Sequence, residues 1–115
     1  MSIEADIVAL VGPLCGSRIY PDIAPVGVAT PFVTYQQVGG EVINIIKGPV
    51  DYGQARIQFN VWSTTRAEAN TLMRSIEAAL RPPALNGRPT GALISRYEEI
   101  TKLRGAQQDF EFWWP

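Results

Sequence analysis

The 115-residue sequence contains no histidine. Histidine is the commonest general base, the usual partner of a serine or cysteine nucleophile, and the commonest metal ligand. The one cysteine, Cys15, has no second cysteine with which to form a disulfide or a zinc site. Most hydrolase and metal-site templates are therefore excluded. We expect no enzymatic activity, no cofactor and no metal, and a structural role for Cys15.

An excess of positive charge is also missing. Lysine and arginine total 10 against 11 aspartate and glutamate residues, which gives a net charge of −1 and an isoelectric point near 5.3. The basic residues are spread along the chain and form no run. Because the long-range field that draws proteins to phosphate backbones is absent, we expect no sequence-specific binding of nucleic acid.

Long apolar runs are absent too. The longest stretch, from Ile7 to Val11, is far shorter than the roughly 20 residues that cross a bilayer. The first residues include Glu4 and Asp6, whereas a signal peptide begins with basic residues. We therefore expect neither membrane insertion nor export.

What the sequence does contain is typical of one globular domain. Hydrophobic residues make up 46% and charged residues 18%, far from the composition of disordered chains. The length suits a single core, so we expect one domain that covers residues 1–115.

Two helices are predicted. Ser2 can cap the first, whose apolar residues Ile3, Ile7, Leu10 and Val11 share one helical face before Gly12-Pro13 ends it. Thr65 and Glu68 form a capping-box pattern that opens the second helix. Its apolar stripe consists of Ala69, Leu72, Met73, Ile76 and Leu80. The prolines of Arg81-Pro82-Pro83 stop it.

Six extended segments are predicted, at residues 18–20, 32–38, 41–46, 54–63, 92–97 and 107–114. Gly39-Gly40 is expected to separate the second from the third, and residues 81–91 to form a long loop. The order is α-β-β-β-β-α-β-β, with a short first strand. Adjacent strands and few helices indicate an α+β fold, a mostly antiparallel sheet with both helices packed on one face.

The carboxylates of Asp109 and Glu111 are the nearest approach to a catalytic pattern. They lie two residues apart on a predicted strand, so both belong to one face, where they could act as an acid pair or hold a cation. The alternative is a solvated or cross-strand-paired polar face opposite Phe110 and Phe112.

The placement of tryptophan is more informative. Trp62 continues the polar stripe of its strand, which also carries Arg56, Gln58 and Asn60, and Trp113 lies on the charged face of the last strand. Tryptophan is enriched at protein interfaces. We interpret both side chains as covered by another subunit, with burial under the chain's own loops as the alternative.

Several segments together resemble the tail-completion (tail-terminator) family of tailed bacteriophages and prophages. The resemblance covers nearly the whole chain in order, and its segments are residues 2–6 (SIEAD), 18–21 (RIYP), 31–36 (PFVTYQ), 55–62 (ARIQFNVW), the helix after Thr65, and 108–113 (QDFEFW). It implies a small α+β virion protein without enzymatic activity. It also implies a homo-oligomeric ring, typically a hexamer, on the head-proximal end of the tail tube.

The implied partners are the tail tube protein and a neck or head-completion protein, and the implied location is the virion after assembly in the host cytoplasm. A ring requires different patches on the two sides of each subunit. The predicted interface is a reaching loop together with a receiving surface or channel wall: Lys47, Gly48, Pro49, Val50, Asp51, Tyr52, Arg56, Gln58, Asn60, Trp62 and Trp113. A near-neutral lumen would let DNA slide past.

Three other functions remain open at this point. A head-closure or neck connector subunit also forms rings. A small enzyme could use Asp109 and Glu111 without histidine, and a stand-alone binding module would be monomeric. The Lys47–Tyr52 loop could also be a plain connector.

Overall fold

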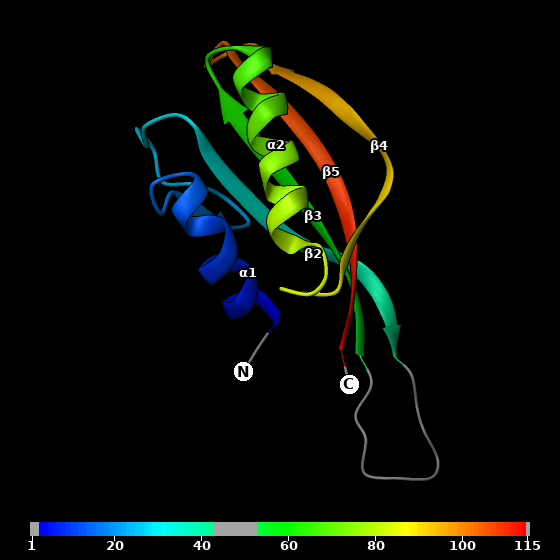
Figure 1. Cartoon of the computed structure of the whole chain (residues 1–115). Helices are drawn as coiled ribbons and strands as arrows, with labels where there is room; N and C mark the ends of the chain where they lie inside the picture. Colours follow the sequence, from blue (N-terminus) through cyan, green and yellow to red (C-terminus); the bar gives the residue numbers. More distant parts are fainter. Residues whose placement is uncertain (1–2, 43–52, 115) are drawn as a thin grey trace, which may run out of the picture.

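Two helices lie on one face of a single five-stranded sheet (Figure 1). The structure is a computed structural model and describes residues 3–42 and 53–114. Its elements are α1 (Ile3–Val11), the 3-10 turn η1 (Gly12–Leu14), β1 (Ile19–Pro21), β2 (Phe32–Val42), β3 (Gly53–Ser63), α2 (Arg66–Leu80), β4 (Gly87–Glu98) and β5 (Leu103–Trp114). In these ranges no helix is both long enough and apolar enough to span a bilayer.

Helix α1 forms as its periodicity predicts. Ile7 and Val11 are buried, and Ile3 and Leu10 pack partly against the core. The predicted cap, Ser2, lies outside the described residues. Pro13 sits in the first turn of η1, where its missing N–H costs little.

Helix α2 has the predicted stripe and half of the predicted capping box. Thr65 Oγ1 accepts a hydrogen bond from the backbone N–H of Glu68 at 3.2 Å. The carboxylate of Glu68 does not return to Thr65 but instead accepts a hydrogen bond from the hydroxyl of Ser63 at the end of β3. The helix therefore starts in contact with the strand that precedes it.

The strand order in the sheet is β1-β2-β3-β5-β4. β1 runs parallel to β2, and every other pair is antiparallel. The predicted fold class, α+β with a mostly antiparallel sheet and both helices on one face, is confirmed. The parallel β1–β2 pairing is a feature that strand periodicity does not specify.

Gly39-Gly40 does not break the second strand, so the prediction of a separate strand at residues 41–46 is wrong. β2 continues through both glycines to Val42 and stays paired with β3, with a shift in register between Gln37 and Gly39. A bulge of this kind absorbs one extra residue without ending the ladder. Residues 43–46 lie outside the described residues, and the order becomes α-β-β-β-α-β-β.

The predicted loop at residues 81–91 is also too long. β4 begins at Gly87 and includes Pro89 and Gly91, with a register shift between Thr90 and Ile94. β4 is an edge strand, and edge strands tolerate proline and bulges that a central strand would not. β5 likewise begins earlier than predicted, at Leu103.

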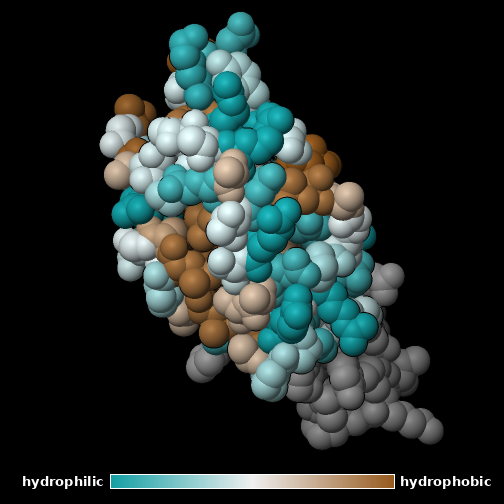
Figure 2. Space-filling model, turned by 45° about the horizontal axis from the view of Figure 1, so that its top comes forward, coloured by the Kyte–Doolittle hydropathy of each residue, from teal (hydrophilic) through white to brown (hydrophobic). Residues whose placement is uncertain are grey.

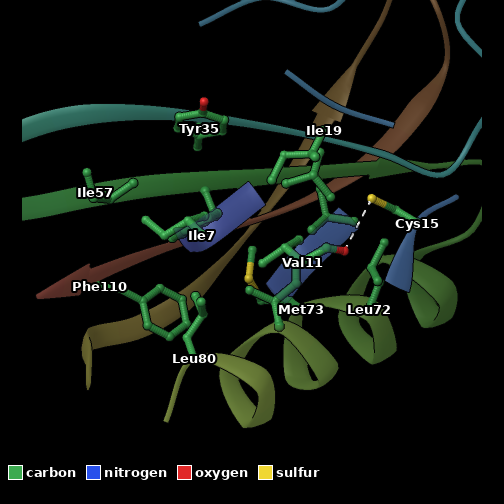
Figure 3. Close-up of a cluster of buried hydrophobic side chains, with 14 of the residues drawn as sticks. Ile7, Val11, Cys15, Ile19, Tyr35, Ile57, Leu72, Met73, Leu80 and Phe110 are labelled. Atoms are coloured by element: carbon green, nitrogen blue, oxygen red, sulfur yellow. Dashed lines mark hydrogen bonds between the residues drawn. The ribbon is translucent and has the colours of Figure 1, made fainter. Parts of the chain in front are cut away.

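The core fills the space between the helices and the sheet (Figure 3). Phe59 and Phe110 on neighbouring strands pack edge to face, with ring centroids 5.3 Å apart. Cys15 belongs to this core: it is 2% exposed, and its Sγ lies 3.7 Å from the carbonyl oxygen of Val11. Burial raises the pKa of the Cys15 thiol, so the reactive thiolate is disfavoured. The structural role expected of Cys15 is confirmed.

Candidate functional site

The face of the sheet opposite the helices carries the predicted interface residues of β3 and β5. We call it the open face and define it by the cross-strand pairs Gln54–Trp113, Arg56–Glu111, Gln58–Asp109, Asn60–Gln107 and Trp62–Gly105. Alternation along both strands puts the phenylalanines on the helix side and these residues on the other. The stripe from Arg56 to Trp62 and the predicted Trp113 are therefore brought together on one surface.

The polar part of the open face is internally paired. Arg56 Nη2 lies 3.4 Å from Glu111 Oε1, with the two side chains 47% and 30% exposed. Asn60 Nδ2 donates a hydrogen bond to Gln58 Oε1 at 3.2 Å. An exposed ion pair of this kind stabilises a fold by about 0–1 kcal/mol. These contacts pre-order this part of the open face, whose charged residues Arg56, Asp109 and Glu111 give a net charge of −1.

Asp109 and Glu111 do share the open face, as their spacing predicts. Glu111 is engaged by Arg56 across the strands, which matches the cross-strand alternative. Asp109 Oδ1 is buried and has no hydrogen-bond partner within residues 3–42 and 53–114. In the same ranges no group of three potential metal-binding side chains exists.

Trp62 is half-buried by its own chain. Its six-membered ring stands over Gly105 on β5, where a Cβ atom would be 2.8 Å from Cε3 and Cζ3. Its indole also lines a cavity of about 620 Å³, together with Phe32, Leu103 and residues of the segment 22–31. Trp62 therefore packs against Gly105 of its own chain and shares a cavity with the segment 22–31.

Strand periodicity does not identify the segment 22–31 as part of this surface. Its apolar residues Ile23 and Val26 are exposed beside the cavity. Pro25 and Pro31, with Gly27 between them, predict only an irregular crossing. The sequence feature that could have identified this segment is its apolar character, which is unusual in a segment expected to run over the surface.

A second hollow, of about 510 Å³, lies on the open face beside β4. It is lined by Arg56, Thr90, Ile94, Gln107 and Asp109, with Gly91 and Ala92. The hollow occurs where the register of β4 shifts between Thr90 and Ile94. A bulge of this kind depends on the pairing with β5, so the sequence pattern alone does not reveal it.

Trp113 lies near the other end of the open face from Trp62 and is 38% exposed. Its backbone N–H donates a hydrogen bond to the carbonyl oxygen of Asn86 at 3.3 Å. The predicted reaching loop, Lys47–Tyr52, lies outside the described residues. The open face therefore carries one tryptophan partly covered by the chain itself and one that is accessible.

Comparison with known proteins agrees with this architecture. The profile of the family described as "Tail completion protein gp17" matches residues 3–114. A chain in a structure entitled "Virion of native gene transfer agent (GTA) particle" has a similar fold, with a TM-score of 0.61 and 16% identity over 97% of this chain and 93% of that chain. No match was found among curated proteins. The chain belongs to the tail completion protein gp17 family, whose members are structural, non-enzymatic components of the virion.

Proposed function

We propose that this protein is a ring-forming tail terminator, a subunit that caps the head-proximal end of the tail tube and joins it to the neck. The observation that carries the proposal is the open face, taken with the match of the family profile to residues 3–114. A sheet covered by helices on one side leaves its other side available to a partner.

The tryptophans distinguish the open face from an ordinary solvated one. Trp62 and Trp113 stand near its two ends, and Trp113 is accessible. Tryptophan buries a large area on association and is over-represented among interface residues. Trp113→Ala should reduce oligomer formation, and an unchanged molar mass by light scattering would argue against this role.

The loop Lys47–Tyr52 is proposed as the arm that reaches a neighbouring subunit. Val42 and Gly53 are Cα partners across β2 and β3, yet ten residues connect them, far more than a tight hairpin needs. Replacement of residues 47–52 by a two-residue turn should leave the fold intact, as judged by circular dichroism, and prevent ring formation. Unchanged rings by negative-stain microscopy would contradict the assignment.

The stripe from Arg56 to Trp62 would be either the receiving surface or the channel wall. If the stripe is the channel wall, the Arg56–Glu111 ion pair would weaken binding of DNA phosphates, because Glu111 neutralises Arg56, the one cation of the stripe. A wall that neutralises few phosphates holds DNA weakly and lets it slide past.

The test is an assembly reaction with purified tail tube protein. Addition of this protein should shorten the tubes and place a ring on one end of each, visible by electron microscopy. The matched control is the 47–52 replacement, which has the same fold without the proposed arm. Tubes of unchanged length with bare ends would overturn the proposal.

A neck connector differs from a terminator in where it assembles. A terminator should be recovered with tails from an infection that makes no heads. Recovery with heads from an infection that makes no tails would instead favour the connector.

A further inference from the structure

The two lateral edges of the sheet, at β1 and at β4, differ in the helix that lies nearest to them. In Figure 1, α1 lies next to β2 on one side, and α2 crosses β3 and β5 toward β4 on the other. We call these the β1 side, residues 3–31, which include α1, η1 and β1, and the β4 side, residues 66–104, which include α2, residues 81–86, β4, the β4–β5 turn and the first two residues of β5. They are opposite ends of the strand order and share no residue.

The β1 side is acidic. Its charged residues are Glu4, Asp6, Arg18 and Asp22, which give a net charge of −2. Arg18 is turned inward: its Nε donates to the carbonyl oxygen of Pro31 at 2.9 Å. Burial raises the pKa of the Tyr35 hydroxyl, and the charges of Glu4 and Asp22 raise it further.

The β4 side is basic. Seven bases and four acids give it a net charge of +3: Arg66, Arg74, Arg81, Arg88, Arg96, Lys102 and Arg104, with Glu68, Glu77, Glu98 and Glu99. Arg81 is paired with Glu77 at 3.3 Å. Within residues 3–42 and 53–114, the guanidinium groups of Arg66 and Arg74 have no ion-pair partner.

The arginines of α2 point away from α1. Leu72 faces α1 and η1 in the core (Figure 3). Arg74 stands roughly 160° and Arg66 roughly 120° around the helix from Leu72, at about 100° per residue. These cations are thus on the flank of the molecule that looks away from the acidic side.

Both sides also expose apolar side chains. Val8 and Leu14 are exposed on the β1 side, and Ile94 and Tyr97 on β4. Figure 2 shows hydrophobic surface in patches, with hydrophilic side chains gathered between them. Each side therefore offers apolar contact area beside its charged residues.

We propose that the β1 side of one copy of this chain docks onto the β4 side of the next, so that an acidic surface meets a basic one around the ring. The inference rests on the proposed ring-forming function and supplies its subunit contact. A cyclic assembly joins two different patches, as this pairing does. Pairing of two β4 sides would instead bring two positive surfaces together, which opposes association.

Two charge-altered variants test the docking. Glu4→Arg with Asp22→Asn changes the β1 side from −2 to +1, and asparagine suits the positive φ of 62° at position 22. Arg66→Glu with Arg74→Glu changes the β4 side from +3 to −1. Each variant alone should associate about tenfold or more weakly than the unaltered protein at low salt.

The two variants mixed in equal amounts should associate again, because each altered side then meets a side of opposite charge. Sedimentation velocity measures this, and thermal unfolding checks that each variant is folded. Gln37→Glu, an isosteric change of charge at an exposed position of β2 that belongs to neither side and not to the open face, is the control and should associate normally. A folded pair that stays apart when mixed would overturn the docking.

The outcomes separate this inference from the proposed function. If the unaltered protein caps tubes but the mixture does not associate, the docking alone is wrong. If the mixture associates but the unaltered protein does not shorten tubes, the docking stands and the terminator function is wrong.

Discussion

The six-membered ring of Trp62 occupies the space in which a side chain at position 105 would stand, 2.8 Å from the place of a Cβ atom. Glycine at position 105 is therefore required by its neighbour on β3. The contact fixes the indole at one end of the open face, beside the cavity lined by the segment 22–31.

Gly105→Ala should lower the free energy of unfolding by about 1–3 kcal/mol, because the added methyl group overpacks against the indole. Urea denaturation measures the change. In a Trp62→Ala background the same substitution should cost much less, since the ring is gone, and this double-mutant cycle isolates the contact. An equal cost in both backgrounds would contradict it.

Gly87→Ala should destabilise the protein by a similar amount, about 1–3 kcal/mol. The added Cβ would lie 2.6 Å from Phe112 Cε1 and 2.8 Å from the carbonyl oxygen of Leu80, and a backbone atom cannot easily move. Gly12→Ala is the matched control, because no atom lies within 4 Å of its Cβ position apart from its chain neighbours and the backbone of its own helical turn. Thermal unfolding of both variants should show a lower midpoint for Gly87→Ala only.

Arg56→Ala and Glu111→Ala should each change the stability of the isolated chain by less than about 1 kcal/mol, as expected for an exposed pair. Denaturant unfolding of both single variants and the double variant gives their coupling energy. If the open face is an interface or a channel wall, these variants should alter tube capping more than they alter folding. A coupling above about 2 kcal/mol would mean that the pair is mainly a folding element.

Cys15 should be alkylated slowly in the folded protein at pH 8 and rapidly in denaturant, because burial raises its pKa above the ordinary value of 9.0. The same shift has a consequence for stability. With the pKa higher in the folded state, the unfolded state loses its proton first, so stability is retained below pH 9 and falls as pH rises further.

Cys15→Ala should remove part of this alkaline decline. Tyr35 should account for another part at higher pH, since burial and then the nearby Glu4 and Asp22 raise its pKa above 10.0. Denaturant midpoints measured between pH 7 and pH 11 test both contributions. Fast labelling of native Cys15 at pH 8 would contradict the structure.

The elements that depend on local signals were predictable. α2 combines a 3.6-residue apolar period with Thr65 as its cap, and both are properties of neighbouring residues in sequence. β3 has a strict two-residue alternation from Gln54 to Ser63, so the position of its stripe on one face followed as well.

The features that depend on pairing between distant strands were not predictable from the sequence. Gly39-Gly40 and Pro89 are ordinary strand breakers, and only the long pairing with β3 and β5 keeps them in strands. The cavity that Trp62 shares with the segment 22–31 is also a tertiary effect, since no periodic pattern indicates where an irregular segment will lie. The pairing of Glu111 with Arg56 likewise needs the register of β3 and β5, which the separate strands do not specify.

The edge formed by β4 has a consequence for how copies of the chain can meet. Pro89 offers no N–H group, and the shift between Thr90 and Ile94 interrupts the row of backbone donors and acceptors. Such an edge is a poor template for another strand, so sheets of neighbouring molecules do not readily fuse into a continuous fibril. Contacts between copies must then be made by side chains. Side-chain contacts can fix the angle between neighbouring molecules and so define a closed assembly, whereas strand addition at a sheet edge can continue without limit.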